Sequence, residues 1–205
     1  MSLFPIFVKL QGRLVVVVGG GIVAEGKIAG LLTAGAHVRI ISPSITPALA
    51  ALVRDCTIAW LPKDFELGDL AGAYLVVAAT SAAGVNDAVF REAEARGILC
   101  NAVDDIEHCH FYYGSVVQRG DLQIAISTNS KSPALAQRLR QQLEAQFGPE
   151  YEAWLEWLGT AREALRGSSA HAEANKRILH QLASQPAFDK FLRETRPPAQ
   201  RKGAA

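Results

Sequence analysis

Apolar runs alternate with amphipathic stretches throughout the first half of the chain. The runs are short and rich in valine, isoleucine and alanine, as expected for strands buried on both faces of a sheet. The stretches between them carry apolar residues at helical spacing. Strands are predicted at residues 14–18, 37–42, 57–61, 74–79 and 98–103, and helices at residues 23–34, 47–54 and 83–96. This alternation predicts a doubly wound parallel α/β sheet, so residues 1–113 should form one domain.

The pattern changes after residue 113. Apolar segments at residues 111–117 and 122–128 flank the turn-forming sequence Gln-Arg-Gly-Asp at 118–121, which predicts an antiparallel hairpin. Ser132-Pro133 then opens a predicted helix that runs to about residue 147, with proline at its first position. A hairpin and one helix cannot close a core of their own. We therefore expect residues 114–148 to be a dimerisation region that packs against a second copy in a homodimer.

The remaining residues, 149–205, predict a helical C-terminal domain. Apolar side chains such as Trp154, Ile178 and Phe188 recur at helical spacing between residues 151 and 195. The last ten residues, 196–205, are predicted to be a frayed tail.

A glycine-rich turn joins the first predicted strand to the first predicted helix. Its sequence Gly19-x-Gly21-x-x-Ala24 is the dinucleotide-binding motif of Rossmann domains, in the strand-turn-helix context that the motif requires. Gly19 permits the tight turn, Gly21 lets a pyrophosphate approach the backbone, and Ala24 allows the helix to pack closely on the strand. The amides from Ile22 and Val23 onward then face the phosphates. A glycine turn in a flavodoxin-like domain without a dinucleotide is the alternative interpretation.

Three further segments end where ligands of doubly wound sheets bind, beyond the carboxyl ends of the strands. The second strand ends at Ser42-Pro43-Ser44, whose hydroxyls and amides can contact a ribose. This tip has neither the acidic residue usual in NAD sites nor the arginine usual in NADP sites, which modestly favours NAD. Small residues around Thr80 at the end of the fourth strand leave room for the nicotinamide ribose, and Asn101-Ala102-Val103 end the fifth strand.

Two aspartates follow the fifth strand directly. Asp104 is nearer the strand, beside the expected nicotinamide, where a carboxylate can take a proton as a hydride leaves the substrate. Aspartate is also common as a cap of turns, and we assign that role to Asp105. The sequence thus predicts Asp104 as the catalytic residue.

The sequence His108-Cys109-His110 admits two interpretations. Two imidazoles on one face of an extended segment can bind a metal ion. The sequence supplies no further ligands, and a free cysteine is usually buried. We therefore favour two surface histidines that flank an inward-facing Cys109, and we predict no metal site.

A polar loop lies between the predicted hairpin and the helix that Pro133 opens. Its hydroxyls, its amide, its amine and a free helix N-terminus make a surface suited to carboxylates, although an ordinary N-cap loop has the same composition. The predicted substrate-binding residues are Ser127, Thr128, Asn129, Lys131 and Ser132.

Composition narrows the class of protein. Of the 205 residues, 49% are hydrophobic and 20% charged, which is typical of a globular protein. Residues 1–113 carry 8 basic and 11 acidic side chains and residues 114–205 carry 13 and 9, an imbalance too weak for a nucleic-acid partner. No apolar run reaches the length of a membrane span, and no signal-peptide pattern is present. Three cysteines without a C-x-x-C motif favour the reducing cytoplasm.

Taken together, these segments resemble one family, the precorrin-2 dehydrogenases, which also form the N-terminal part of siroheme synthases. Order and spacing match from residue 3 to about residue 145, and beyond residue 150 the likeness is only in helical character. The matching segments are residues 3–10, 17–27, 78–80, 101–105, 109–111 and 127–134.

The resemblance implies NAD-dependent oxidation of precorrin-2, a tetrapyrrole, to sirohydrochlorin in siroheme biosynthesis, by an interlocked homodimer. Some family members also insert Fe²⁺ as ferrochelatases. The family's essential aspartate corresponds to Asp104, and its substrate loop corresponds to residues 127–132. Its dinucleotide contacts correspond to residues 21–23, 43–44 and 101–103.

Three positions depart from the family's usual residues. Gly26 stands where the family usually has arginine, Thr128 where it usually has serine, and Asn129-Ser130 where it commonly has two glycines. Two other functions fit the same fold. A non-catalytic NAD-sensing domain has no need of an aspartate at the fifth strand beside a polar loop, and a chelatase alone would insert metal without NAD.

Overall fold

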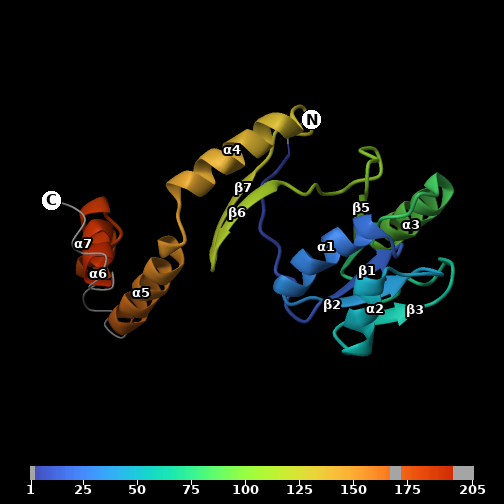
Figure 1. Ribbon diagram of the computed structural model, residues 1–205, viewed down its shortest axis with the longest axis horizontal. Coiled ribbons are helices and arrows are strands. Elements are labelled where there is room, and N and C mark those ends of the chain that lie inside the picture. The colour runs from blue at the N-terminus through green and yellow to red at the C-terminus, as the bar shows by residue number, and fades with distance from the viewer. Residues whose placement is uncertain (1–2, 167–171, 196–205) are drawn as a thin grey trace. The chain divides into compact units, whose positions relative to one another are not determined.

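The computed structural model describes residues 3–166 and 172–195 (Figure 1). The chain divides into two compact units, the first spanning Phe4–Tyr113 and the second made of the described residues from Gly114 onward together with Leu3. The tail predicted at residues 196–205 lies outside the described residues. The predicted boundary between residues 148 and 149 within the second part stays a prediction.

The first unit is a five-stranded parallel sheet with helices on both faces, which confirms the predicted fold class. The strand order is β3-β2-β1-β4-β5, and the order reverses direction at β1. The strands are β1 (Leu14–Val18), β2 (His37–Ile41), β3 (Ala59–Leu61), β4 (Leu75–Ala78) and β5 (Leu99–Ala102), and the helices are α1 (Ile22–Thr33), α2 (Pro47–Arg54) and α3 (Ala83–Arg96).

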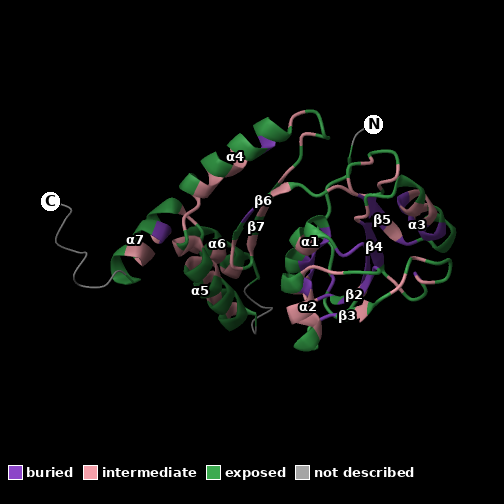
Figure 2. Cartoon of the chain, turned by 45° about the vertical axis from the view of Figure 1, so that its right-hand side comes forward, coloured by how far each residue is buried: buried purple, intermediate pink, exposed green. Residues whose placement is uncertain are grey.

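The valine run of β1 is explained by burial on both faces. Val15 and Val17 belong to a core cluster shared with α1 and α2, whereas Val16 and Val18 belong to a second cluster shared with α3. All four valines are at most 1% exposed. Figure 2 shows the consequence, since β4 and β5 are purple while the outer surfaces of the helices are green.

Left-handed residues end the first two helices. Gly35, at φ 76°, closes α1 with the hydrogen bonds of a Schellman motif, as its position at the end of the helical pattern suggests. Cys56, at φ 55°, does the same for α2, where Thr57 N–H and Ile58 N–H donate to the carbonyl of Leu52. These bonds hold residues 57 and 58 against α2, so β3 begins at Ala59 and not at residue 57 as predicted.

In its described residues, the second unit contains a hairpin and four helices. The hairpin strands are β6 (Ser115–Arg119) and β7 (Leu122–Ile126), followed by α4 (Pro133–Gln146), α5 (Glu150–Leu165), α6 (Ala172–Leu182) and α7 (Gln185–Thr195). Among the described residues, none of these helices combines the length and apolar character needed to span a bilayer.

The hairpin exists as predicted, but its strand limits were wrong. Arg119 pairs with Leu122, so the loop has two residues, Gly120 and Asp121, in place of four. Gly120 takes φ 54°, which a two-residue loop needs and which glycine adopts without cost. Arg119 also donates to the carbonyls of Phe147 and Glu144 at 2.8 and 3.2 Å, which fixes the strand end to the end of α4.

The core of the second unit is small. Within its described part the buried apolar residues are Val117, Ala136 and Phe188, which are at most 7% exposed. Phe188 on α7 packs against the rings of Tyr151 and Trp154 on α5, with both centroid distances 4.6 Å. Other large apolar side chains of this unit remain about 40% exposed, namely Val116, Leu135, Trp157 and Ile178.

Candidate functional site

A cavity of about 770 Å³ opens at the carboxyl ends of the parallel strands, where β1 and β4 adjoin at the reversal of strand order. Ligands of doubly wound sheets bind at this position. Of the cofactor-binding residues that the sequence predicts, those lining the cavity are Gly19, Gly21, Ile22, Val23, Ser42, Pro43, Thr80 and Val103, and the predicted catalytic Asp104 lines it too.

The three glycines of the turn differ in the space around their Cβ positions. Gly19 has φ 111°, and a Cβ there would clash with the carbonyl of Ala79. A Cβ on Gly20 would clash with the carbonyl of Ser44, so the middle glycine is needed for the approach of the β2 tip. A Cβ on Gly21 would meet nothing within 4 Å. The space over Gly21 is therefore open on the cavity side and fits a group that approaches the backbone.

The N-terminus of α1 borders this open space. Gly21 is the N-cap and makes no side-chain cap hydrogen bond, so the first amides of the helix lack that partner. Ile22 and Val23 are 82% and 48% exposed, whereas Ala24 is fully buried against the sheet. Free amides and the positive end of the helix dipole suit the phosphates of a dinucleotide. Ala24 contributes packing and does not line the cavity.

The tip of β2 is held by its own polar groups. Ser42 Oγ donates to the carbonyl of Ser44 at 2.7 Å, and Trp60 Nε1 donates to the carbonyl of Ser42 at 2.9 Å. Ser44 does not line the cavity, and its carbonyl lies against Gly20. Thr46, two residues further on, does line the cavity, and its hydroxyl donates to Glu25 on α1 at 2.6 Å.

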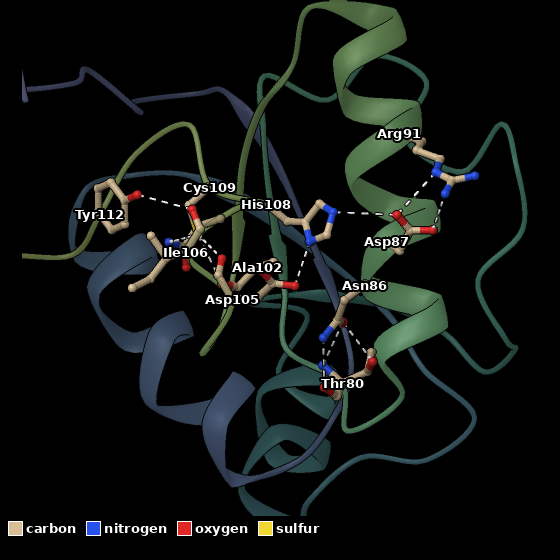
Figure 3. A network of polar contacts seen from close by, with 11 residues as sticks. Thr80, Asn86, Asp87, Arg91, Ala102, Asp105, Ile106, His108, Cys109 and Tyr112 are labelled. Atoms are coloured by element: carbon tan, nitrogen blue, oxygen red, sulfur yellow. Dashed lines mark hydrogen bonds and ion pairs between the residues drawn. The ribbon is translucent and has the colours of Figure 1, made fainter. Parts of the chain in front are cut away.

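The tip of β4 is fixed by α3. The buried amide of Asn86 donates from Nδ2 to the carbonyl of Thr80 at 3.1 Å, and its Oδ1 accepts from Thr80 Oγ1 at 2.8 Å (Figure 3). Thr80 thereby has a fixed position in the cavity wall.

The tip of β5 carries Asp104 in an unusual backbone conformation. Asp104 has φ 61°, in the left-handed region that aspartate tolerates better than most residues. Asn101 and Ala102, which the sequence assigned to the cofactor, do not line the cavity. Asn101 Nδ2 donates to the carbonyl of Phe111 at 2.9 Å, and Ala102 is 1% exposed because it lies inside the sheet.

Asp105, unlike Asp104, does not line the cavity, and its side chain stabilises the turn that follows β5. Its carboxylate accepts a hydrogen bond from His108 Nδ1 at 2.6 Å. This bond lowers the pKa of the Asp105 carboxyl, to which backbone bonds from His108 and Glu107 add, and it raises the pKa of the His108 imidazole. A carboxylate that accepts backbone amides of its own turn is the capping role expected from the sequence.

The residues of His108-Cys109-His110 are each engaged by neighbours. His110 pairs with Glu94 of α3, and the Cys109 thiol lies 3.1 Å from the carbonyl of Ala102. Burial raises the pKa of the Cys109 thiol. Across residues 3–166 and 172–195, no group of three or more His, Cys, Asp or Glu side chains is placed to hold a metal ion.

The loop at residues 127–132 belongs to the second unit. Ser132 is the N-cap of α4, its Oγ accepting from Leu135 N–H at 3.2 Å. Thr128 Oγ1 donates to the carbonyl of Ser132 at 3.1 Å. Asn129 and Ser130 take φ 51° and 60°, the left-handed conformation that glycine would adopt most readily. The loop therefore forms an N-cap, and it also presents polar side chains at the start of α4, so both interpretations of its composition stay open.

Both parts of the chain are similar to known proteins. The family model described as "Putative NAD(P)-binding" matches residues 6–115, and the model described as "Sirohaem biosynthesis protein central" matches residues 119–146. The siroheme synthase of Neisseria meningitidis serogroup B is 40% identical over 178 residues, which are 87% of this chain and 37% of that protein. Siroheme synthase 1 of Aeromonas salmonicida is 39% identical over 184 residues, which are 90% of this chain and 39% of that protein.

The chain belongs to the siroheme synthase N-terminal and precorrin-2 dehydrogenase family. It spans less than two fifths of the length of these curated relatives. A solved structure titled "SirC, precorrin-2 dehydrogenase" shares the fold, with a TM-score of 0.77 at 23% identity over 94% of this chain and 98% of the other.

In this family member, sequence reasoning missed several residues that line the cavity. Gly20 and Thr46 stand beside predicted residues, and Ser81, Ala82 and Val85 continue the segment that Thr80 begins. The missed charged residue is Asp64, which follows β3 with Phe65. Among the described lining residues Asp64 and Asp104 are the charged ones, so the wall carries carboxylates and no basic side chain. A search for acidic residues after β3 as well as after β2 would have found Asp64.

Proposed function

We propose that this chain is a precorrin-2 dehydrogenase that oxidises precorrin-2 to sirohydrochlorin with NAD. The observation that carries the proposal is Asp104, which lines one cavity together with the glycine turn at the switch point of the sheet. A base beside a dinucleotide site is the minimum that a dehydrogenation needs. The names of the curated relatives and of the solved structure supply the substrate.

Each part of the chain has one task in this reaction. The first amides of α1 would bind the pyrophosphate, for which the open space over Gly21 leaves room. The nicotinamide, when bound, supplies the acceptor for the hydride that leaves the tetrapyrrole. Thr80, held by Asn86, and Val103 line the cavity at the tips of β4 and β5 and would help to hold the nicotinamide. The Asp104 carboxylate takes the proton, so two electrons and two hydrogens leave the substrate for each turnover.

We assign recognition of the substrate's carboxylates to the loop before α4. Lys131 is exposed and supplies a positive charge, and the N-terminus of α4 adds the positive end of a helix dipole. The hydroxyls of Ser127 and Thr128 already hold the loop's own backbone through bonds of 3.1 Å. Ser127 Oγ accepts from Asn129 N–H, so its hydroxyl proton can donate to a carboxylate, whereas the Thr128 proton is already used on the carbonyl of Ser132.

The charge of the cavity wall supports NAD as the cofactor. A 2′-phosphate on the adenosine ribose needs an arginine or lysine, and the described lining supplies none. Asp64 would lie on the β3 side of the cavity, where it would repel that phosphate. A free ribose hydroxyl can instead donate to a carboxylate.

The experiment that tests the function is an anaerobic assay of the purified chain with precorrin-2 and either NAD or NADP. We expect sirohydrochlorin to form, with reduced cofactor in equal amount, and faster with NAD than with NADP at equal concentration. Binding of NAD without any turnover would favour a sensing domain, and faster turnover with NADP would refute the cofactor assignment. Incubation of sirohydrochlorin with Fe²⁺ and no NAD tests the chelatase alternative.

We further propose that the chain works as a homodimer. The described part of the second unit buries three apolar residues and leaves Val116 and Leu135 about 40% exposed on the hairpin and α4. A unit of this size with so small a core needs a partner surface. Light scattering should give twice the chain mass of 22.0 kDa at micromolar concentration. A mass of one chain throughout that range would contradict the proposal.

A further inference from the structure

Two neighbouring residues of α3 hold two walls of the cavity. Asn86 fixes the β4 tip through Thr80, as described above. The next residue, Asp87, lies 3.6 Å through Oδ1 from His108 Nε2. His108 belongs to the turn that follows β5 and carries Asp104. One turn of one helix therefore contacts both the nicotinamide-side strand tip and the Asp104 turn (Figure 3).

His108 lies between two carboxylates that come from different elements. Its Nδ1 donates to Asp105 Oδ2 at 2.6 Å within the turn, and its Nε2 faces Asp87 Oδ1 on α3. Phe90 of the same helix packs edge-on against the imidazole, with ring centroids 4.8 Å apart. Arg91 holds the Asp87 carboxylate from the other side with contacts of 3.0 and 3.2 Å. The imidazole is thus oriented by its partners and by packing.

The turn itself forces Asp104 into its left-handed conformation. Asp105 N–H donates to the carbonyl of Ala102 at 3.3 Å, which closes the backbone around residues 103 and 104. Ala102 N–H in turn donates to the carbonyl of His108 at 3.2 Å. A non-glycine residue at φ 61° keeps that conformation only where the surroundings enforce it. The link from Asp105 through His108 to Asp87 is the side-chain part of this enforcement.

We propose that His108 is a positioning residue, which ties the Asp104 turn to α3 and holds the Asp104 carboxylate at the cavity wall. The catalytic part of this inference rests on the proposed dehydrogenase function. His108 does not line the cavity, so it acts through the turn and not on the substrate. The link is strongest when the imidazole is protonated, because both ring nitrogens then donate to carboxylates.

The charges around His108 set the direction of the pH dependence. Asp105 and Glu107 face it from the turn and Asp87 faces it from α3, and together they raise its pKa above the ordinary value of 6.5. Arg91 neutralises part of the charge on Asp87. His110, whose ring stacks on Phe90, is paired with a different residue of α3, Glu94. A raised pKa means that the link is complete at low pH and is lost as the pH rises through that value.

The first test is an NMR titration of the wild-type chain. We expect the backbone amide signals of Asp104 and Asp105 to shift with the same midpoint as the His108 ring, and that midpoint to lie above 6.5. This measurement needs neither NAD nor substrate, so it decides the link even if the chain is not a dehydrogenase. Asp104 signals that stay fixed while His108 titrates would overturn the proposal.

The second test compares variants in the dehydrogenase assay. His108→Gln should lower turnover about tenfold, less than loss of the base itself, with NAD affinity unchanged. The fall in wild-type turnover at alkaline pH should be absent from this variant. Asp87→Asn should act in the same direction. The matched control is Glu94→Gln, which removes the corresponding contact of His110 from the same helix and should keep wild-type turnover. An unchanged alkaline fall in His108→Gln, or an equal loss in Glu94→Gln, would overturn the proposal.

Discussion

Replacing Asp104 by asparagine should lower turnover by about 10²–10⁴, the usual contribution of a general base. The substitution keeps the size and polarity of the side chain and removes its ability to take a proton. Asparagine also tolerates the left-handed backbone at φ 61° at least as well as aspartate, so the turn should keep its shape. The measurement is the rate of sirohydrochlorin formation at saturating NAD and precorrin-2.

NAD affinity distinguishes this effect from damage to the cavity. Titration calorimetry should give the same NAD dissociation constant for Asp104→Asn and for wild type. Asp55→Asn serves as the matched control, because Asp55 is an exposed aspartate of the same unit at the end of α2 and does not line the cavity. Near-normal turnover of Asp104→Asn would remove Asp104 from the chemistry and direct attention to the loop at residues 127–132.

The fold of the first unit could be predicted because its signals are local. An all-apolar β1 requires burial on both faces, and the glycine at 35 marks the end of α1 wherever that helix packs. The start of β3 could not be predicted in this way. Thr57 and Ile58 have strand-forming side chains, but their amides are used to close α2. The predicted limits of the hairpin strands were wrong for a similar reason. The positive φ of Gly120 allows a two-residue loop, which the composition of the turn does not indicate.

The site residues that could be predicted are also those with local signals. Gly19 and Gly21 belong to a motif that lies in one continuous segment, and they line the cavity. Gly20 is required by the carbonyl of Ser44, which only the folded sheet brings close. Asp64 reaches the cavity because β3 pairs with β2. Asn101 does not line the cavity, and its amide donates to the carbonyl of Phe111, a contact between segments ten residues apart.

Replacing Gly21 by aspartate should abolish NAD binding without harming the fold. A Cβ at this position meets nothing within 4 Å, so the side chain would extend into the space assigned to the pyrophosphate. A carboxylate beside a diphosphate adds like-charge repulsion to the loss of space, and we expect NAD affinity to fall more than about 100-fold. The backbone at Gly21, with φ −84° and ψ −174°, is the extended conformation of an N-cap, where aspartate is among the preferred residues.

The stability of this variant should therefore equal or slightly exceed that of wild type, since aspartate caps α1 and its charge complements the helix dipole. Gly26→Asp is the matched control, because Gly26 lies one turn further along α1, is exposed, and likewise has open space around its Cβ position. Calorimetry with NAD and thermal unfolding of both variants make the comparison. Loss of NAD binding in Gly21→Asp alone, with both variants folded, is the expected result. Wild-type NAD affinity in a folded Gly21→Asp would show that the dinucleotide does not pass over this turn, and the cavity would then need another ligand.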